Sequence, residues 1–82
     1  MGGENEPAFE PVEELPPSCK LVYKMLTWEG PLTSQKLAEK TMLSPRTIRY
    51  ATDRLEENGH VASEIHLADA RMVRYSLAPE EG

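Results

Sequence analysis

The spacing of hydrophobic residues changes once along the chain, from a helical period to an alternating one at His60. Apolar side chains recur every three or four positions in three earlier segments, which predicts three helices. From His60 the period is two, and the same alternation returns in 73–77 beyond Ala68–Arg71, which predicts a β-hairpin with its tip at that loop. The first helical segment is 16–29, the second lies between Thr33 and the turn at Met42-Leu43, and the third runs from Ser44-Pro45 to Asn58-Gly59.

Start and stop signals bound these helices. Gly30-Pro31 ends the first helix, and Asn58-Gly59 supplies a left-handed stop for the third. In the third helix Ile48, Ala51, Thr52 and Leu55 fall within one 100° arc, which is expected to face the core. The expected capping residues are Ser18 for the first helix, Thr33 for the second and Ser44 for the third, with Pro45 in its first position.

The order of the elements defines the expected fold class. A short extended stretch at Pro31-Leu32 separates the first two helices, and a tight turn at Met42-Leu43 separates the second from the third. Three helices, a short strand and a two-stranded wing in this order predict an α+β protein, a winged helix-turn-helix.

The apolar surface of the first predicted helix is wider than packing against a single core requires. Leu21, Val22, Met25 and Leu26 form one stripe, but Cys19, Tyr23 and Trp28 extend the apolar arc to roughly 220°, against about 100° for a surface helix. Either a second copy of the chain packs on the excess, through Tyr23 and Trp28, or the wing and the C-terminal residues cover it. We expect a homodimer through this helix.

The charge of the chain is unevenly distributed. The net charge is −5, yet residues 1–15 and the C-terminus hold seven of the 14 acidic residues, so the remainder carries nine basic and seven acidic residues, a net of +2. The expected organisation is a disordered acidic tail over 1–15, a folded domain over 16–78 and a short disordered tail over 79–82. The tail acts either as a solubiliser or as a mimic of DNA charge that competes for the basic face. Deleting residues 1–14 is expected to spare the fold.

Composition excludes several classes of protein. The chain has 82 residues, 39% of them hydrophobic, which suits one small domain. It has a single cysteine, and no segment resembles a signal peptide or a membrane span, so we expect a cytoplasmic protein with no membrane partner. Catalysis is not expected, and neither is a metal or cofactor, because the sequence offers no phosphate loop or paired nucleophile and base. His60 and His66 are expected to be solvated or partly packed, and Cys19 to be a structural thiol.

One family pattern matches residues 31–77. The strings Leu37-Ala38-Glu39, Leu43-Ser44-Pro45-Arg46-Thr47-Ile48-Arg49, Arg54-Leu55-Glu56-Glu57-Asn58-Gly59 and Asp69-Ala70-Arg71, with Tyr75-Ser76-Leu77, resemble the DNA-binding core of the MarR-type regulators. They also resemble small MarR-like winged-helix proteins of archaea. The chain departs from the family at Met42, where the turn usually has glycine, so that either a side chain is forced to positive φ or the turn takes another path. The sequence does not show the long flanking helices through which MarR proteins dimerise and form an effector pocket. The resemblance therefore does not imply a small-molecule effector for this chain.

The resemblance implies double-stranded DNA as the partner. In the third helix Arg46, Thr47, Arg49 and Tyr50 fall where family members address the major groove, and Arg71, braced by Asp69, falls where a wing arginine enters the minor groove. The chemistry agrees, because arginine matches the guanine edge in bidentate geometry. Asp53 is expected to orient Arg49, and Arg74, with Arg54 as a further candidate, to add charge toward phosphates. The remaining expected DNA contacts are Thr33, Ser34, Gln35 and Lys36 at the start of the second helix, and Ser44 and Pro45 at the start of the third.

The sequence therefore favours a DNA-binding transcriptional regulator, with the third helix in the major groove and the wing in the minor groove. The alternative is a winged-helix module for protein contacts in a transcription or processing complex. The basic exposed face of the third helix, poor in apolar residues, favours the first. For the arginines the plain alternative is a solvated helix face.

Overall fold

The computed structural model describes residues 10–65 and 73–78. Its helices are α1 (Pro17–Glu29), α2 (Ser34–Thr41) and α3 (Pro45–Glu57), preceded by one turn of 3-10 helix, η2 (Val12–Glu14). Its strands are β1 (Leu32–Thr33), β2 (Val61–Ile65) and β3 (Val73–Leu77). The predicted fold class, a winged helix-turn-helix, is confirmed. The predicted hairpin tip, with Asp69 and Arg71, and His66 lie outside the described residues.

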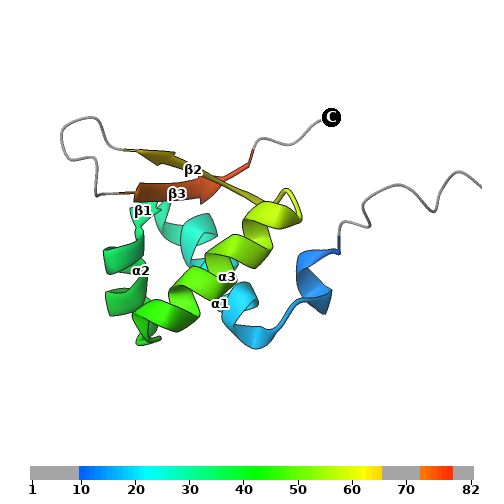
Figure 1. Cartoon of the computed structure of the whole chain (residues 1–82), viewed down its shortest axis with the longest axis horizontal. Helices are drawn as coiled ribbons and strands as arrows, with labels where there is room; N and C mark the ends of the chain where they lie inside the picture. The colour runs from blue at the N-terminus through cyan, green and yellow to red at the C-terminus, as the bar shows by residue number, and fades with distance from the viewer. Residues whose placement is uncertain (1–9, 66–72, 79–82) are drawn as a thin grey trace, which may run out of the picture.

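The three strands form one antiparallel sheet in the order β1, β3, β2. Tyr75 in β3 is the central partner, since it pairs with Leu32 on one side and with Ser63 on the other. The sheet lies along one side of the three helices, and α3 runs diagonally beneath it (Figure 1). The short strand predicted at Pro31-Leu32 is shifted by one residue, to Leu32–Thr33, and ties the start of α2 to the wing.

The core lies where the three helices meet the sheet. Every α3 residue that was expected to face inward is buried, and the hydroxyl of Thr52 donates to the backbone oxygen of Arg49 at 3.1 Å, which satisfies the one polar side chain among them. In α1 the fully buried stripe is Cys19, Val22 and Leu26, while Leu21 and Met25 are only half-buried. The other buried apolar residues are Leu15, Leu37, Ile48, Ala51, Leu55 and Val61.

Two of the three expected helix caps are present. The backbone N–H of Lys36 donates to the Thr33 hydroxyl, and that of Thr47 to the Ser44 hydroxyl, both at 3.1 Å. The expectation for Ser18 is wrong, because α1 begins at Pro17 and the capping position belongs to Pro16, which has no side-chain donor or acceptor. Pro17, in the first position, has no backbone N–H to satisfy, and the backbone N–H of Cys19 donates to the Pro16 backbone oxygen at 2.9 Å in place of a side-chain cap.

The sequence left two possibilities for the turn between α2 and α3, a residue forced to positive φ or a different path. The structure shows the first, which is strained. Met42 has φ 64° and ψ 16°, in the left-handed region, and its backbone N–H donates to the Ala38 oxygen at 2.9 Å. Its side chain is 87% exposed, so no packing offsets the strain. The helix-turn-helix geometry is thus kept at a conformational cost.

We expect Met42→Gly to raise the free energy of unfolding by about 1 kcal/mol, because glycine adopts this conformation without a side-chain clash. A thermal melt followed by circular dichroism should show an increase in Tm of about 4–8 °C for a domain of this size. Glu39→Gly is the control, since Glu39 is an exposed residue inside α2 and glycine there should lower Tm. A fall in Tm for both variants would show that Met42 is not strained in solution.

The chain before α1 packs on the domain, which corrects the expected boundary at residue 16. Leu15 is only 2% exposed and belongs to the core, and Val12 in η2 packs against it. Glu10 is hydrogen-bonded to the far end of α3, as described below. We call residues 10–15 the N-terminal strap. The rest of the expected tails, residues 1–9 and 79–82, lies outside the described residues.

The lone cysteine and one of the histidines have packed, structural surroundings. Cys19 is fully buried, and this burial raises the pKa of its thiol, which outweighs the opposing effect of the Arg54 charge. A thiol held protonated in this way is a poor nucleophile. The ring of His60 is half-buried and meets Tyr23 edge to face, with centroids 6.1 Å apart.

Candidate nucleic-acid interface

The first turn of α2, the outer side of α3 and strand β3 surround a shared groove of about 580 Å³. Arg49 and Asp53 enter it from α3, while Tyr75 enters it from β3. The groove exists because Ala51 and Leu55 turn the opposite side of α3 into the core, and because β3 pairs with Thr33 of β1, the residue that caps α2. The other lining residues are Ser34, Gln35, Ala38, Pro45, Ile48 and Val73.

The arginines of α3 are where the helical period predicts them. Arg46, Arg49 and Tyr50 are exposed, and the Tyr50 side chain is 44% accessible despite its size. All three lie in the first two turns of α3, next to the exposed first turn of α2. The structure thus brings together the residues that were expected to reach base edges.

Some of the residues that were predicted to contact DNA make helix-capping hydrogen bonds instead. The Ser44 hydroxyl donates to the Thr47 hydroxyl at 3.0 Å, besides accepting from the Thr47 backbone, and Thr47 is half-buried. These two side chains therefore fix the start of α3, and Pro45 fills its first position. Ser34, Gln35 and Lys36 are exposed in the first turn of α2, where backbone N–H groups and the helix dipole favour an anion. Lys36 lies 3.8 Å from Glu39 in an exposed pair.

Two expected electrostatic roles look different in the structure. Asp53 was expected to orient Arg49, but the ion pairs between described residues do not include one that joins them, although both line the groove. Arg74 is exposed on β3 and lies 3.4 Å from Glu64 on β2, directly across the hairpin. Arg71 lies outside the described residues.

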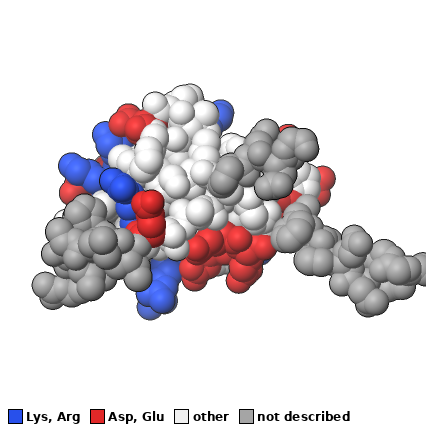
Figure 2. Space-filling model, turned by 90° about the horizontal axis from the view of Figure 1, so that it is seen from above, with Lys and Arg blue, Asp and Glu red and all other residues white. Residues whose placement is uncertain are grey.

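Charge is polarised along α3. Arg46 and Arg49 occupy its first half, whereas its second half holds Asp53, Glu56 and Glu57, together with Arg54, whose charge is paired with Glu10. Figure 2 shows basic side chains gathered toward the end of the molecule that holds α2, and an acidic patch further along the same edge. A polyanion approaching this side is attracted to the first turns of α2 and α3 and repelled by the carboxylates of Asp53, Glu56 and Glu57.

A contact at the end of α3 was missed by the sequence-based reasoning. The Arg54 guanidinium, expected to add charge toward DNA, donates to the Glu10 carboxylate at 2.9 Å. The only signal in the sequence is the apolar pair Val12 and Leu15, three residues apart and just before the prolines that open α1. Five glutamates in that stretch conceal this pattern.

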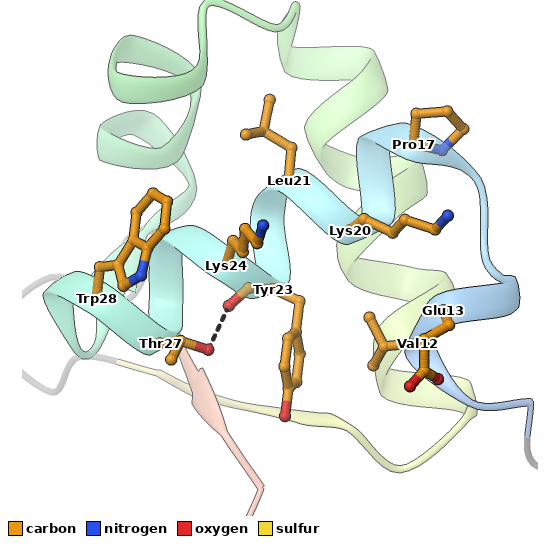
Figure 3. A pocket seen from close by; sticks show the side chains of 9 residues that line it. All are labelled: Val12, Glu13, Pro17, Lys20, Leu21, Tyr23, Lys24, Thr27 and Trp28. Atoms are coloured by element: carbon orange, nitrogen blue, oxygen red, sulfur yellow. Dashed lines mark hydrogen bonds between the residues drawn. The ribbon is translucent and has the colours of Figure 1, made fainter.

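The outer face of α1 carries a second groove, of about 710 Å³, bounded on one side by η2 (Figure 3). Trp28 stands at one end, 69% exposed, with the Lys24 ammonium 5.8 Å from its ring centroid. Leu21 and Val12 line the groove, and Tyr23 lies between it and His60. The excess apolar surface of α1 is thus partly covered by the N-terminal strap, which neither of the two expectations included.

Other kinds of site find no support in the part of the chain that the structure describes. Residues 10–65 and 73–78 hold no group of three His, Cys, Asp or Glu side chains that is placed to bind a metal ion. Among the same residues, none of the helices combines the length and the apolar character that crossing a membrane requires.

The family model for the MarR family matches residues 24–73, more than half of the chain, so the chain belongs to the MarR family. Members of this family are transcription regulators and not enzymes. No curated protein matches the sequence significantly.

Solved structures agree with this assignment. A probable transcriptional regulator from Pseudomonas aeruginosa is 26% identical, with a TM-score of 0.75 over 80% of this chain and 50% of its own. The YusO protein from Bacillus subtilis is also 26% identical, with a TM-score of 0.73 over 78% of this chain and 45% of its own. BpsR from Bordetella bronchiseptica, whose DNA binding is regulated by 6-hydroxynicotinic acid, shares the fold at 24% identity, with a TM-score of 0.75 over 87% of this chain and 54% of its own. The chain therefore spans about half the length of these proteins.

Proposed function

We propose that this protein is a cytoplasmic, DNA-binding transcriptional regulator that places α3 in the major groove of duplex DNA and its wing in the minor groove. The observation that carries the proposal is the convergence of the first turn of α2, Arg49 of α3 and strand β3 on one groove, with Arg46 exposed in the same first two turns of α3. An α-helix fits the major groove, and the flanking elements are then placed to contact phosphates.

Within this proposal, base recognition is the role of Arg46 and Arg49, with Tyr50 on a thymine methyl or the sugar-phosphate backbone and Asp53 at the edge of the groove. Phosphate contacts fall to Thr33, Ser34, Gln35 and Lys36 at the start of α2, and to Arg74 on the wing. Ser44, Pro45 and Thr47 set the start of the recognition helix. Arg71 is proposed to enter the minor groove, with Asp69 bracing it.

Salt-titrated binding to random duplex DNA tests the proposal. Four to six neutralised phosphates per protomer give a slope of roughly −4 to −5 in a plot of log K against log salt, because each contact releases condensed counterions. Fluorescence anisotropy with a labelled duplex between 50 and 200 mM salt measures this slope. A flat affinity over that range would reject DNA binding and favour the alternative role in protein contacts.

We also propose that the protein acts as a homodimer through the α1 groove. Trp28 and Leu21 are the residues free to meet a second copy there, while Tyr23, which was expected to share the contact, is half-buried against the core and His60. A two-fold axis through this face would present two α3 helices to half-sites about 34 Å apart.

Trp28→Glu should convert the dimer to a monomer, because it replaces the large exposed ring of the proposed apolar contact with a charge. Light scattering at high protein concentration measures the mass of both forms. Glu39→Gln, an exposed substitution on α2, is the control and should leave the mass unchanged. A wild-type protein that is monomeric with and without DNA would refute the dimer.

A further inference from the structure

Glu10 makes three contacts that tie the N-terminal strap to the end of the recognition helix. Its carboxylate accepts from Arg54 at 2.9 Å, its backbone N–H donates to the side-chain oxygen of Asn58 at 2.8 Å, and its backbone oxygen lies 2.6 Å from the His60 ring nitrogen Nε2. The Asn58 amide in turn donates to the Arg54 backbone oxygen at 2.8 Å. Main-chain bonds thus hold residue 10 in place whatever the charge of its side chain.

Arg54 belongs to a row of residues that begins on the proposed DNA-facing side of α3. Arg46, Tyr50 and Arg54 follow each other at intervals of four, so they lie along one edge of the helix over about 12 Å. The last two members of the row are in contact, since Arg54 Nη1 lies 3.5 Å from the Tyr50 hydroxyl. Arg54 is therefore the last cation of the row that starts with a base-reading candidate, and in the proposed complex it would contact the next phosphate along the groove wall.

From these contacts we infer that Glu10 is a built-in competitor of DNA phosphate for Arg54, so that the N-terminal strap lowers the affinity of the recognition helix for DNA. The inference rests on the proposed DNA-binding function. In the free protein Glu10 neutralises Arg54 and turns its guanidinium toward the strap. Removing the Glu10 charge leaves the same guanidinium available to a DNA phosphate, whose oxygens an arginine can bind in bidentate geometry.

The competition is close enough to be measured. The Arg54 and Glu10 side chains are 32% and 47% exposed, so their ion pair is partly solvated and weaker than a buried one. A phosphate on DNA offers the same hydrogen-bond acceptors and releases a condensed counterion when it is neutralised. Release of Arg54 is thus expected to change affinity by a few fold and to leave the fold intact.

Glu10→Gln is the test, because it removes the charge while it keeps the size of the side chain and the backbone contacts of residue 10. Duplex affinity is expected to rise about two- to fivefold at 150 mM salt. The salt slope is expected to steepen by about 0.9, the value for one further phosphate contact. Glu13→Gln is the matched control, since it makes the same charge change in the same strap but faces the α1 groove. At this salt concentration a distant exposed charge is screened, so Glu13→Gln should leave affinity and slope near those of the wild type.

The Arg54→Ala background distinguishes the mechanism from a general charge effect. If Glu10 acts through Arg54, adding Glu10→Gln to Arg54→Ala gives no further gain in affinity. Equal gains from Glu10→Gln and Glu13→Gln, or a gain that persists without Arg54, would overturn the inference, as would no gain from Glu10→Gln at an unchanged Tm. A wild-type protein that does not bind duplex DNA at any salt concentration would instead reject the proposed function itself.

Discussion

Replacing Leu15 with alanine should lower the free energy of unfolding by about 2–5 kcal/mol, the range for leucines truncated inside a packed core. Leu15 is 2% exposed and packs in the same cluster as the buried residues of α1 and α3. A domain of this size has a stability of only a few kcal/mol, so the variant should be largely unfolded near 37 °C. Urea denaturation followed by circular dichroism measures the change.

Leu21→Ala makes the same chemical change at a half-buried position in the outer groove of α1, and its cost should be clearly smaller. Deletion of residues 1–14, which the sequence alone suggests would spare the fold, should now destabilise it, because it removes Val12 and the contacts of Glu10. Equal stabilities of Leu15→Ala and Leu21→Ala would mean that the strap does not pack on the domain in solution.

The sequence predicted α3 and its surroundings well because several local signals agree there. Ser44 and Pro45 define the start, the inward arc from Ile48 to Leu55 sets the rotation, and Gly59 permits the left-handed stop. Once the rotation is fixed, the outward placement of Arg46 and Arg49 follows from the 3.6-residue period. The candidate interface on α3 could therefore be predicted from spacing alone.

The N-terminal strap could not be predicted in the same way. Val12 and Leu15 are two apolar residues in a segment dominated by glutamate, too few for a periodic signal. What holds the segment is tertiary: the core admits Leu15, and Asn58, Arg54 and His60 supply partners for Glu10 from about 50 positions away in the sequence. The glutamate-rich composition of the segment gave no sign of the few residues in it that contact the folded domain.

The sequence also could not predict which charged side chains form ion pairs. An interval of four residues makes an Arg49 and Asp53 pair possible, yet side-chain rotamers and competing partners decide whether it forms. Arg54 shows the opposite outcome, since its partner comes from a segment that no helical spacing relates to α3. The same limit applies to Tyr23, whose contact with His60 depends on where the turn after α3 places the histidine ring.

Replacing Arg46 or Arg49 with alanine should cost about 1–3 kcal/mol of binding on a preferred duplex and relax its specificity, because each guanidinium can satisfy two acceptors on a guanine edge. Both side chains are exposed and lie outside the core, so Tm should be unchanged. Anisotropy titrations of each variant against one preferred and one random duplex distinguish a loss of base recognition, which weakens the preferred duplex more, from a loss of charge, which weakens both.

Lysine at the same positions provides the sharper control. Arg46→Lys and Arg49→Lys keep the positive charge but lose the planar fork, so they should retain affinity for the random duplex while losing discrimination. Lys36→Ala removes an expected phosphate contact at the start of α2, and it should weaken both duplexes alike and flatten the salt slope by about 0.9. If the alanine variants of Arg46 and Arg49 behave like Lys36→Ala, α3 supplies charge without reading bases.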